Sequence, residues 1–281
     1  MATINVDSWD SFVNALTTAH DDDVINVTSN IDAQYYMETF TRAIHITASN
    51  LTIEGNEYTI KNITNINFGN TDYLDVFIFA GNNIKINNLN FSNVWLTSKN
   101  TCFASSNSNT VGNVTFSGCT INIRTKYPIF IGGITVNNCM ITFNQCTGNI
   151  GNGQNAVTSA HYEYCWIRFN GWREVPSLSF PAFRYLKRCY LEGDLAFHDN
   201  ENVRYLFGCS SCCVNVSCEI RGFTNLDELI EVSSEALVNV INKTKIPALI
   251  NEPETDKNKI VTDAQMKDSE YLASIGFDII P

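Results

Sequence analysis

The chain has 281 residues, of which 44% are hydrophobic and 17% are charged, so it can bury a sizeable core and is not a disordered chain. It has 18 Lys and Arg against 29 Asp and Glu, and this net charge of −11, without a basic cluster, argues against nucleic-acid binding. Asparagine is abundant, with 36 copies, whereas the Ala, Glu, Lys and Leu enrichment of a helical bundle is missing.

The N-terminal residues and the apolar runs bear on targeting. No apolar run approaches the roughly 20 residues that cross a bilayer, so we expect no membrane insertion. Residues 1–6 have neither a basic n-region nor an apolar h-region, so we expect no Sec-type signal. We therefore expect the protein to be made in a cytoplasm. If it acts outside a cell, we expect it to leave by another route, such as lysis.

The first predicted element is an amphipathic helix over residues 7–19. Asp7 or Ser8 can cap its N-terminus, and apolar residues recur at helical spacing, namely Trp9, Phe12, Val13 and Leu16. A short strand is predicted at residues 24–27. We expect residues 1–23 to form a helical cap at the N-terminal end of the structure.

Repeated alternating segments follow the helix. Residues 51–60, 84–93, 114–123 and 134–143 each contain two alternating strands around a two-residue polar break, and looser copies centre on Cys165, Cys189 and Cys218. Short strands at a period in the twenties predict a solenoid, since a propeller blade needs about 40–45 residues and a leucine-rich repeat consensus is missing. The predicted fold is an all-β parallel β-helix over residues 24–245.

Five of the ten cysteines occupy one position of this repeat, namely Cys119, Cys139, Cys165, Cys189 and Cys218. Stacked coils would place them above one another at about the 4.8 Å strand spacing, where a small apolar side chain suits the interior. We predict a column of buried thiols, and disulfides are the alternative. Asparagine fits turn corners and hydrogen-bonded ladders, although an AT-rich genome would also raise its frequency.

The C-terminal segment, residues 246–281, is predicted to be a linker followed by a short docking helix. Residues 251–258 have the composition of a linker, and Thr262 can cap a helix that ends before Gly276. An imperfect apolar face is predicted to dock on another protein or to form a trimer through Met266, Tyr271, Leu272, Ile275 and Phe277.

Carboxylates that could catalyse a reaction are scarce. Residues 100–160 contain no Asp or Glu, which excludes an acidic calcium site there. Glu192 and Asp194 alternate with Leu191 and are predicted to share a strand face, so they are the runner-up candidates for a hydrolytic pair. Solvated acids on a strand are the simpler interpretation.

Cysteine chemistry is the next alternative. Cys209 and Cys212 have zinc-like spacing, but no second pair follows and no His is near, so we predict no metal site and no cofactor. A cysteine nucleophile would need His161 or His198 beside a thiol of the column, and nothing in the sequence fixes such a pair.

Aromatic and basic residues are concentrated after residue 165. The predicted binding surface consists of Trp166, Arg168, Trp172, Arg173 and Tyr190, and Tyr185 and Tyr205 could extend it. Trp166 precedes an inward Ile167 and should therefore point outward, where Trp and Arg can contact a sugar or a protein. Packing under a loop or against a neighbouring subunit is the alternative.

Several segments resemble known proteins. Trp9, Phe12 and Ala15, then residues 23–27 and 51–56, resemble the opening of right-handed β-helix proteins of the pectate-lyase-like superfamily, over about residues 5–240. The ending, residues 271–280, resembles the tail of β-helix proteins of phages and prophages of low-GC bacteria and of bacterial surface adhesins. This resemblance implies a right-handed solenoid and no particular activity, because the superfamily includes lyases, hydrolases, adhesins and virion fibres.

Together these features predict a non-enzymatic phage virion protein of the fibre, spike or decoration type. It would present a rigid β-helix for host-surface or particle attachment, with other virion proteins and a host-surface glycan as partners. The resemblance implies a homotrimer. The alternatives are a polysaccharide-degrading enzyme of the tailspike or lyase type and a bacterial surface adhesin.

Overall fold

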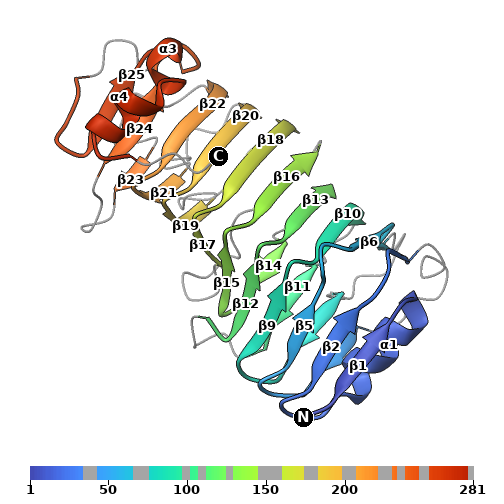
Figure 1. Ribbon diagram of the computed structural model, residues 1–281. Coiled ribbons are helices and arrows are strands. Elements are labelled where there is room, and N and C mark those ends of the chain that lie inside the picture. Colours follow the sequence, from blue (N-terminus) through green and yellow to red (C-terminus); the bar gives the residue numbers. More distant parts are fainter. Residues whose placement is uncertain are drawn as a thin grey trace.

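A computed structural model gives the structure of the chain and describes residues 1–33, 43–65, 76–96, 102–106, 112–124, 129–144, 160–173, 183–197, 207–220, 230–232, 238–246 and 253–277. The described strands form three sheets that run along an elongated solenoid (Figure 1). Neighbouring strands pair in parallel. The all-β parallel β-helix predicted from the repeats is therefore confirmed.

The three sheets are named here by their strands. Sheet A contains, in order, β1 (Thr3–Val6), β2 (Val24–Val27), β5 (Thr52–Glu54), β9 (Ile84–Asn87), β12 (Val114–Ser117), β15 (Ile134–Asn137), β17 (His161–Glu163), β19 (Phe183–Lys187), β21 (Phe207–Ser210) and β23 (Ile230–Val232). Sheet B contains β3 (Ile31–Asp32), β6 (Thr59–Lys61), β7 (Thr64–Asn65), β10 (Asn90–Leu96), β13 (Thr120–Arg124), β16 (Met140–Asn144), β18 (Trp166–Arg173), β20 (Tyr190–Phe197), β22 (Cys213–Ile220), β24 (Asn239–Asn242) and β25 (Asn258–Val261). Sheet C contains β4 (Ile44–Ile46), β8 (Phe77–Phe79), β11 (Phe103–Ser105) and β14 (Phe130–Ile131).

Alternation along each strand separates the core from the surface. In β12, Val114 and Phe116 are buried, whereas Thr115 and Ser117 are more exposed. Successive coils stack the inward residues, so that the ring of Phe103 lies 5.4 Å from the rings of both Phe77 and Phe130. The interior is consequently a continuous apolar and aromatic column.

Asparagine side chains form ladders between coils, as expected from their abundance. Asn50 donates to Asp22 at 3.0 Å, and Asn83 donates to Asn50 at 2.9 Å. All three residues have positive φ angles, between 54° and 67°. Asn and Asp tolerate this left-handed conformation, so the ladder stabilises a corner that few other residues adopt.

The predicted column of thiols lies at the corner between sheets A and B. Cys119, Cys139, Cys165 and Cys189 are buried and free of disulfides, as predicted. Each thiol donates to a carbonyl of the preceding coil, for example Cys165 to Val136 at 3.2 Å and Cys189 to Tyr162 at 3.3 Å.

The fifth position of the column was predicted wrongly. Cys212 donates its thiol to the carbonyl of Leu186 at 3.5 Å and so continues the column. Cys218 lies six residues later, within β22 of sheet B, where its backbone pairs with Leu195. The number of residues per coil varies, and four cysteines lie between positions 209 and 218. The sequence alone therefore did not show which of them aligns with Cys189.

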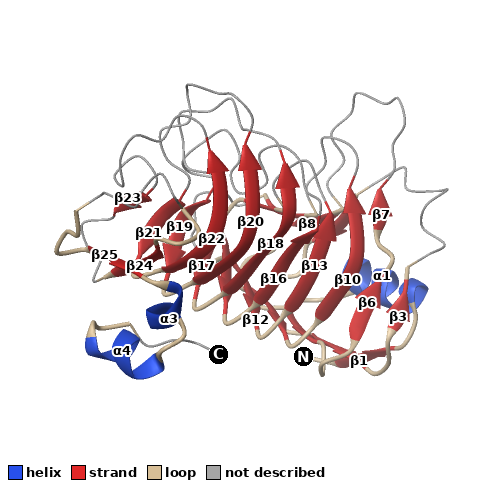
Figure 2. Cartoon of the chain, turned by 90° about the horizontal axis from the view of Figure 1, so that it is seen from above, coloured by secondary structure: helices blue, strands red, loops and turns tan. Residues whose placement is uncertain are grey.

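The N-terminal end begins with a strand as well as a helix. β1 pairs with β2, so the solenoid already starts within the predicted cap of residues 1–23. Helix α1 (Trp9–Thr18) starts at the N-cap Ser8, whose side chain accepts from the backbone N–H of Ser11. Its buried face includes Trp9 and Phe12, and the helix packs against β4, the edge strand of sheet C. Figure 2 shows the helix at the N-terminal end of the solenoid.

The C-terminal helices lie on the outer face of sheet B. Helix α3 (Asp263–Met266) and helix α4 (Ser269–Ser274) follow β25, which pairs with β24 and extends the sheet beyond the predicted limit at residue 245 (Figure 1). The predicted docking residues are engaged within the chain. Met266, Leu272 and Phe277 are buried with Cys213, Val240 and Val261, and Tyr271 and Ile275 pack against this cluster. The proposed docking face is therefore corrected to an intramolecular cap.

Candidate functional site

The outer face of sheet B carries the predicted aromatic and basic residues on adjacent strands. The pairing of β18 with β20 places Trp166 beside Tyr190 and Arg168 beside Glu192. Ile167 and Leu191 lie between them in sequence and point into the core. The four outward side chains, Trp166, Arg168, Tyr190 and Glu192, are called the Trp166 cluster below.

Contacts within the Trp166 cluster fix the arrangement of its side chains. The guanidinium carbon of Arg168 lies 4.5 Å from the centroid of the Trp166 ring, and the ring of Tyr190 meets that of Trp166 edge-on at 5.8 Å. Arg168 Nε also donates to Glu192 Oε1 in an ion pair. These contacts preorganise the cluster. The Arg168 and Glu192 side chains remain 44% and 23% exposed and the two rings are half-buried, so the cluster is partly accessible from solvent.

The indole N–H of Trp166 is a buried donor without an acceptor among the described residues. Such a group costs free energy, because it has lost its hydrogen bond to water and gained none from the protein. Its neighbour Arg168 lies over the same ring. The site therefore holds one unused donor beside an apolar ring.

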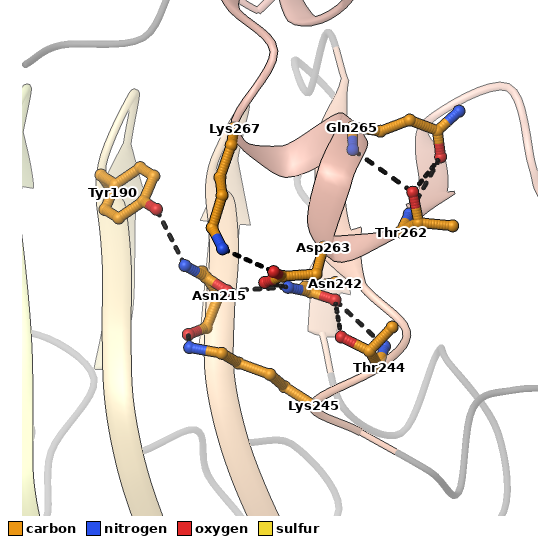
Figure 3. A network of polar contacts seen from close by, with 9 residues as sticks. All are labelled: Tyr190, Asn215, Asn242, Thr244, Lys245, Thr262, Asp263, Gln265 and Lys267. Atoms are coloured by element: carbon orange, nitrogen blue, oxygen red, sulfur yellow. Dashed lines mark hydrogen bonds and ion pairs between the residues drawn. The ribbon is translucent and has the colours of Figure 1, made fainter.

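A polar network joins this cluster to the C-terminal cap (Figure 3). Asn215 Nδ2 donates to the Tyr190 hydroxyl at 2.9 Å, and Asn242 Nδ2 donates to Asn215 Oδ1 at 2.9 Å and to Asp263 Oδ1 at 3.2 Å. Lys267 Nζ donates to Asp263 Oδ2 at 2.6 Å, and this bond lowers the pKa of the Asp263 carboxyl. Helix α3 is therefore fixed on the face that holds the cluster.

Partial burial also affects Tyr190 directly. Removal of the Tyr190 hydroxyl from water raises its pKa above the usual value, so it remains a neutral phenol at physiological pH. It can then act as a hydrogen-bond donor toward a ligand while it accepts from Asn215.

Other predicted residues of the binding surface have different outcomes. Trp172 and Arg173 belong to β18 beyond a bulge at Gly171, and their side chains are outside the described part of the structure. Tyr185 lies on sheet A, where its ring stacks on His161 at 4.2 Å, so it does not extend this surface. Tyr205 lies outside the described residues.

The runner-up catalytic carboxylates flank Gly193 on β20. Glu192 is occupied by its ion pair with Arg168, and the register places Asp194 beside Asn170. Gly193 has a φ of 112°, and a Cβ there would lie 2.0 Å from the carbonyl oxygen of Phe169, so only glycine fits between the two acids. The two carboxylates are thus held on one strand, but Glu192 is already paired with Arg168.

The cysteine alternatives do not form a site. Cys165 and Cys189 are fully buried, and desolvation raises the pKa of both thiols well above the usual value. His161 lies on the outer face of sheet A, whereas His198 is outside the described residues. Within the described ranges, no group of three His, Cys, Asp or Glu side chains is arranged to hold a metal ion.

Sequence reasoning missed the amides that border the cluster. Asn215 and Asn242 are buried on the outer face beneath helix α3. Both lie on strands with apolar inward neighbours, Val214 and Ile241, so alternation would have placed them outward. Their proximity to Tyr190 depended on the register between coils.

Comparisons with known proteins cover part of the chain. Residues 3–125 match the family model described as "Putative pectate lyase-like adhesive domain". This match spans the coils from β1 to β13 and ends before the Trp166 cluster. No curated protein and no solved structure gives a significant match. None of the described helices is long and apolar enough to cross a membrane.

Proposed function

We propose that the chain is a non-enzymatic attachment protein whose β-helix presents the outer face of sheet B to a glycan on a cell surface. The observation that carries the proposal is the Trp166 cluster, where an indole ring, a guanidinium and a phenol are fixed on paired strands. Trp, Tyr and Arg dominate binding surfaces because they combine apolar area with hydrogen-bond donors. The description of the matched family as adhesive supports the same function.

Within this proposal the chain is a fibre, spike or decoration protein of a phage virion, synthesised in the host cytoplasm. Repeated in-register pairing gives a stiff scaffold without a cofactor, which suits a particle component. Other virion proteins and further copies of the chain, assembled as a homotrimer, are the proposed partners. Because the C-terminal apolar residues pack within the chain, such contacts would use other surfaces.

A polysaccharide-degrading enzyme is the second candidate, and a bacterial surface adhesin shares the binding chemistry. The observation that favours an enzyme is the presence of Glu192 and Asp194 on one strand beside the half-buried rings of Trp166 and Tyr190. A hydrolase needs one carboxyl as an acid and another as a base or nucleophile. The ion pair of Glu192 with Arg168 favours a structural role for that carboxylate.

The test measures binding and product formation separately. Purified protein is incubated with capsular and wall polysaccharides of low-GC bacteria, and retained protein, new reducing ends and unsaturated products are quantified. We expect retention without product, lost in Trp166→Ala and kept in Trp166→Phe, which preserves a ring and removes the unused N–H. Product formation abolished by Glu192→Gln or Asp194→Asn would replace attachment by catalysis.

A further inference from the structure

A second Trp–Arg pair lies on the same outer face of sheet B, nearer the N-terminal end. Trp95 of β10 is 38% exposed, which is unusual for a residue of this size. The guanidinium carbon of Arg124, on the neighbouring strand β13, lies 5.0 Å from the centroid of its ring. This pair repeats the chemistry of Trp166 and Arg168 three strands away.

The register gives the separation of the two pairs. Trp95 aligns with Arg124, and the same row continues through β16 to Asn170 of β18, four residues after Trp166. Three strand spacings are about 14 Å, and four residues along a strand are about 13 Å, so the two indoles lie roughly 20 Å apart on a diagonal. One strand spacing is close to the length of one hexose in an extended glycan.

The surface between the two pairs is polar and hydrogen-bonding. Asn170 Nδ2 donates to Asn144 Oδ1 at 3.1 Å, and Thr142 lies beside Arg168 in the adjacent row. Amides and hydroxyls placed at regular intervals between aromatic rings match a chain whose units alternate apolar C–H faces with hydroxyl groups.

The charge of the chain favours a neutral glycan over an anionic one. The chain carries a net charge of −11, and the positive charge of Arg168 is compensated by Glu192. A polyanionic glycan would meet overall repulsion, whereas a neutral one would not.

We infer that one unbranched, neutral glycan crosses the outer face of sheet B from the Trp95–Arg124 pair to the Trp166 cluster and contacts both. This inference rests on the proposed function and adds the second subsite, the path and the class of ligand. Roughly five hexose units are needed to span both indoles.

The test uses cello-oligosaccharides and N-acetylchito-oligosaccharides from dimer to hexamer, with oligogalacturonides of matched length as the anionic series. Calorimetric titration of the full chain should show affinity that rises up to the pentamer or hexamer for at least one neutral series. Trp95→Ala should weaken hexamer binding roughly tenfold and so remove most of the gain in affinity of the hexamer over the dimer, whereas Trp166→Ala should weaken both. Trp95→Phe, which keeps a ring, is the matched control.

Any one of the following results would overturn the inference. Equal binding of dimer and hexamer, or no effect of Trp95→Ala on the hexamer, would remove the second subsite while the Trp166 cluster remains a binding site. Tighter binding of oligogalacturonides would replace the neutral ligand by an anionic one. Retention on wall polysaccharide without binding to any of these oligomers would refute an unbranched neutral ligand and leave the attachment function standing, whereas loss of retention as well would refute both.

Discussion

Residues with positive φ at the corners between sheets A and B set the direction in which the side chains of the following sheet B strand point. Asn138 occupies this position in one coil, and Tyr164 and Arg188 occupy it in the next two, with φ angles of 50° to 53°. The left-handed conformation is costly for bulky side chains, and the backbone N–H of Tyr164 offsets part of the cost by donating to Lys187 at 2.9 Å. An inward cysteine follows each corner, so Trp166 must point outward.

The Asp23 carboxylate makes stability depend on pH at the N-terminal end. It is 4% exposed and accepts from the backbone N–H groups of His20 at 3.0 Å and Ala2 at 2.6 Å. The His20 bond, then the Ala2 bond, lowers the pKa of Asp23 below 3.8. A lowered pKa in the folded state contributes stability above the unfolded value, and this contribution is lost as pH falls through the folded value.

We therefore expect Asp23→Ala to lower Tm at neutral pH, and the deficit to shrink once the pH falls below about 3.8. Thermal unfolding followed by circular dichroism from neutral to strongly acidic pH measures the difference. Asp10→Ala removes an exposed carboxylate of helix α1 and serves as the control. A deficit that is constant with pH would show that the carboxylate charge is not what stabilises this end.

At the scale of elements, the C-terminal cap is a separate apolar cluster outside the solenoid. Cys213, Val240 and Val261 occupy outward positions of β22, β24 and β25, and they are buried there with Met266 of helix α3 and Leu272 of helix α4. Cys213 lies 3.1 Å from the sulfur of Met266, and its burial raises the pKa of its thiol to about 12. The thiol is consequently protonated and unreactive while the cap is closed.

Leu272→Ala should open this cap, because Leu272 is fully buried and truncation of a buried leucine costs about 2–5 kcal/mol. Alkylation with iodoacetamide, mapped by mass spectrometry, should become faster at Cys213 and stay slow at Cys165 and Cys189. Glu270→Ala, an exposed change on the same helix, should leave all three rates unchanged. Faster reaction of the column thiols together with Cys213 would mean that cap and solenoid open as one unit.

Across the whole molecule, the sequence predicted the parallel β-helix because alternation and the recurring cysteines depend only on local period and coil length. It also predicted the outward direction of Trp166 from the inward Ile167. The partners across coils could not be predicted, since coil lengths vary and each unequal coil shifts which residues are neighbours. The Arg168–Glu192 pair, the Trp95–Arg124 pair and the place of Cys212 all depended on this register.

A solenoid couples each coil only to its neighbours, so a weakened central coil should divide the molecule. Phe116 is fully buried and its ring meets Phe79, Phe103 and Phe130 at 6.4, 4.8 and 5.0 Å, which joins three coils. Phe116→Ala should cost about 3–5 kcal/mol of unfolding free energy.

Phe116→Ala should also separate one unfolding transition into two. The amides of β1–β9 and those of β15–β22 should lose protection from hydrogen exchange at different urea concentrations. Hydrogen exchange followed by mass spectrometry at increasing urea distinguishes the two halves. Thr115→Ala, at the outward position next to Phe116, should keep a single transition. If the Phe116 variant also unfolds in one step, coupling must extend beyond adjacent coils, and the stiffness proposed for the attachment function would be a property of the entire chain.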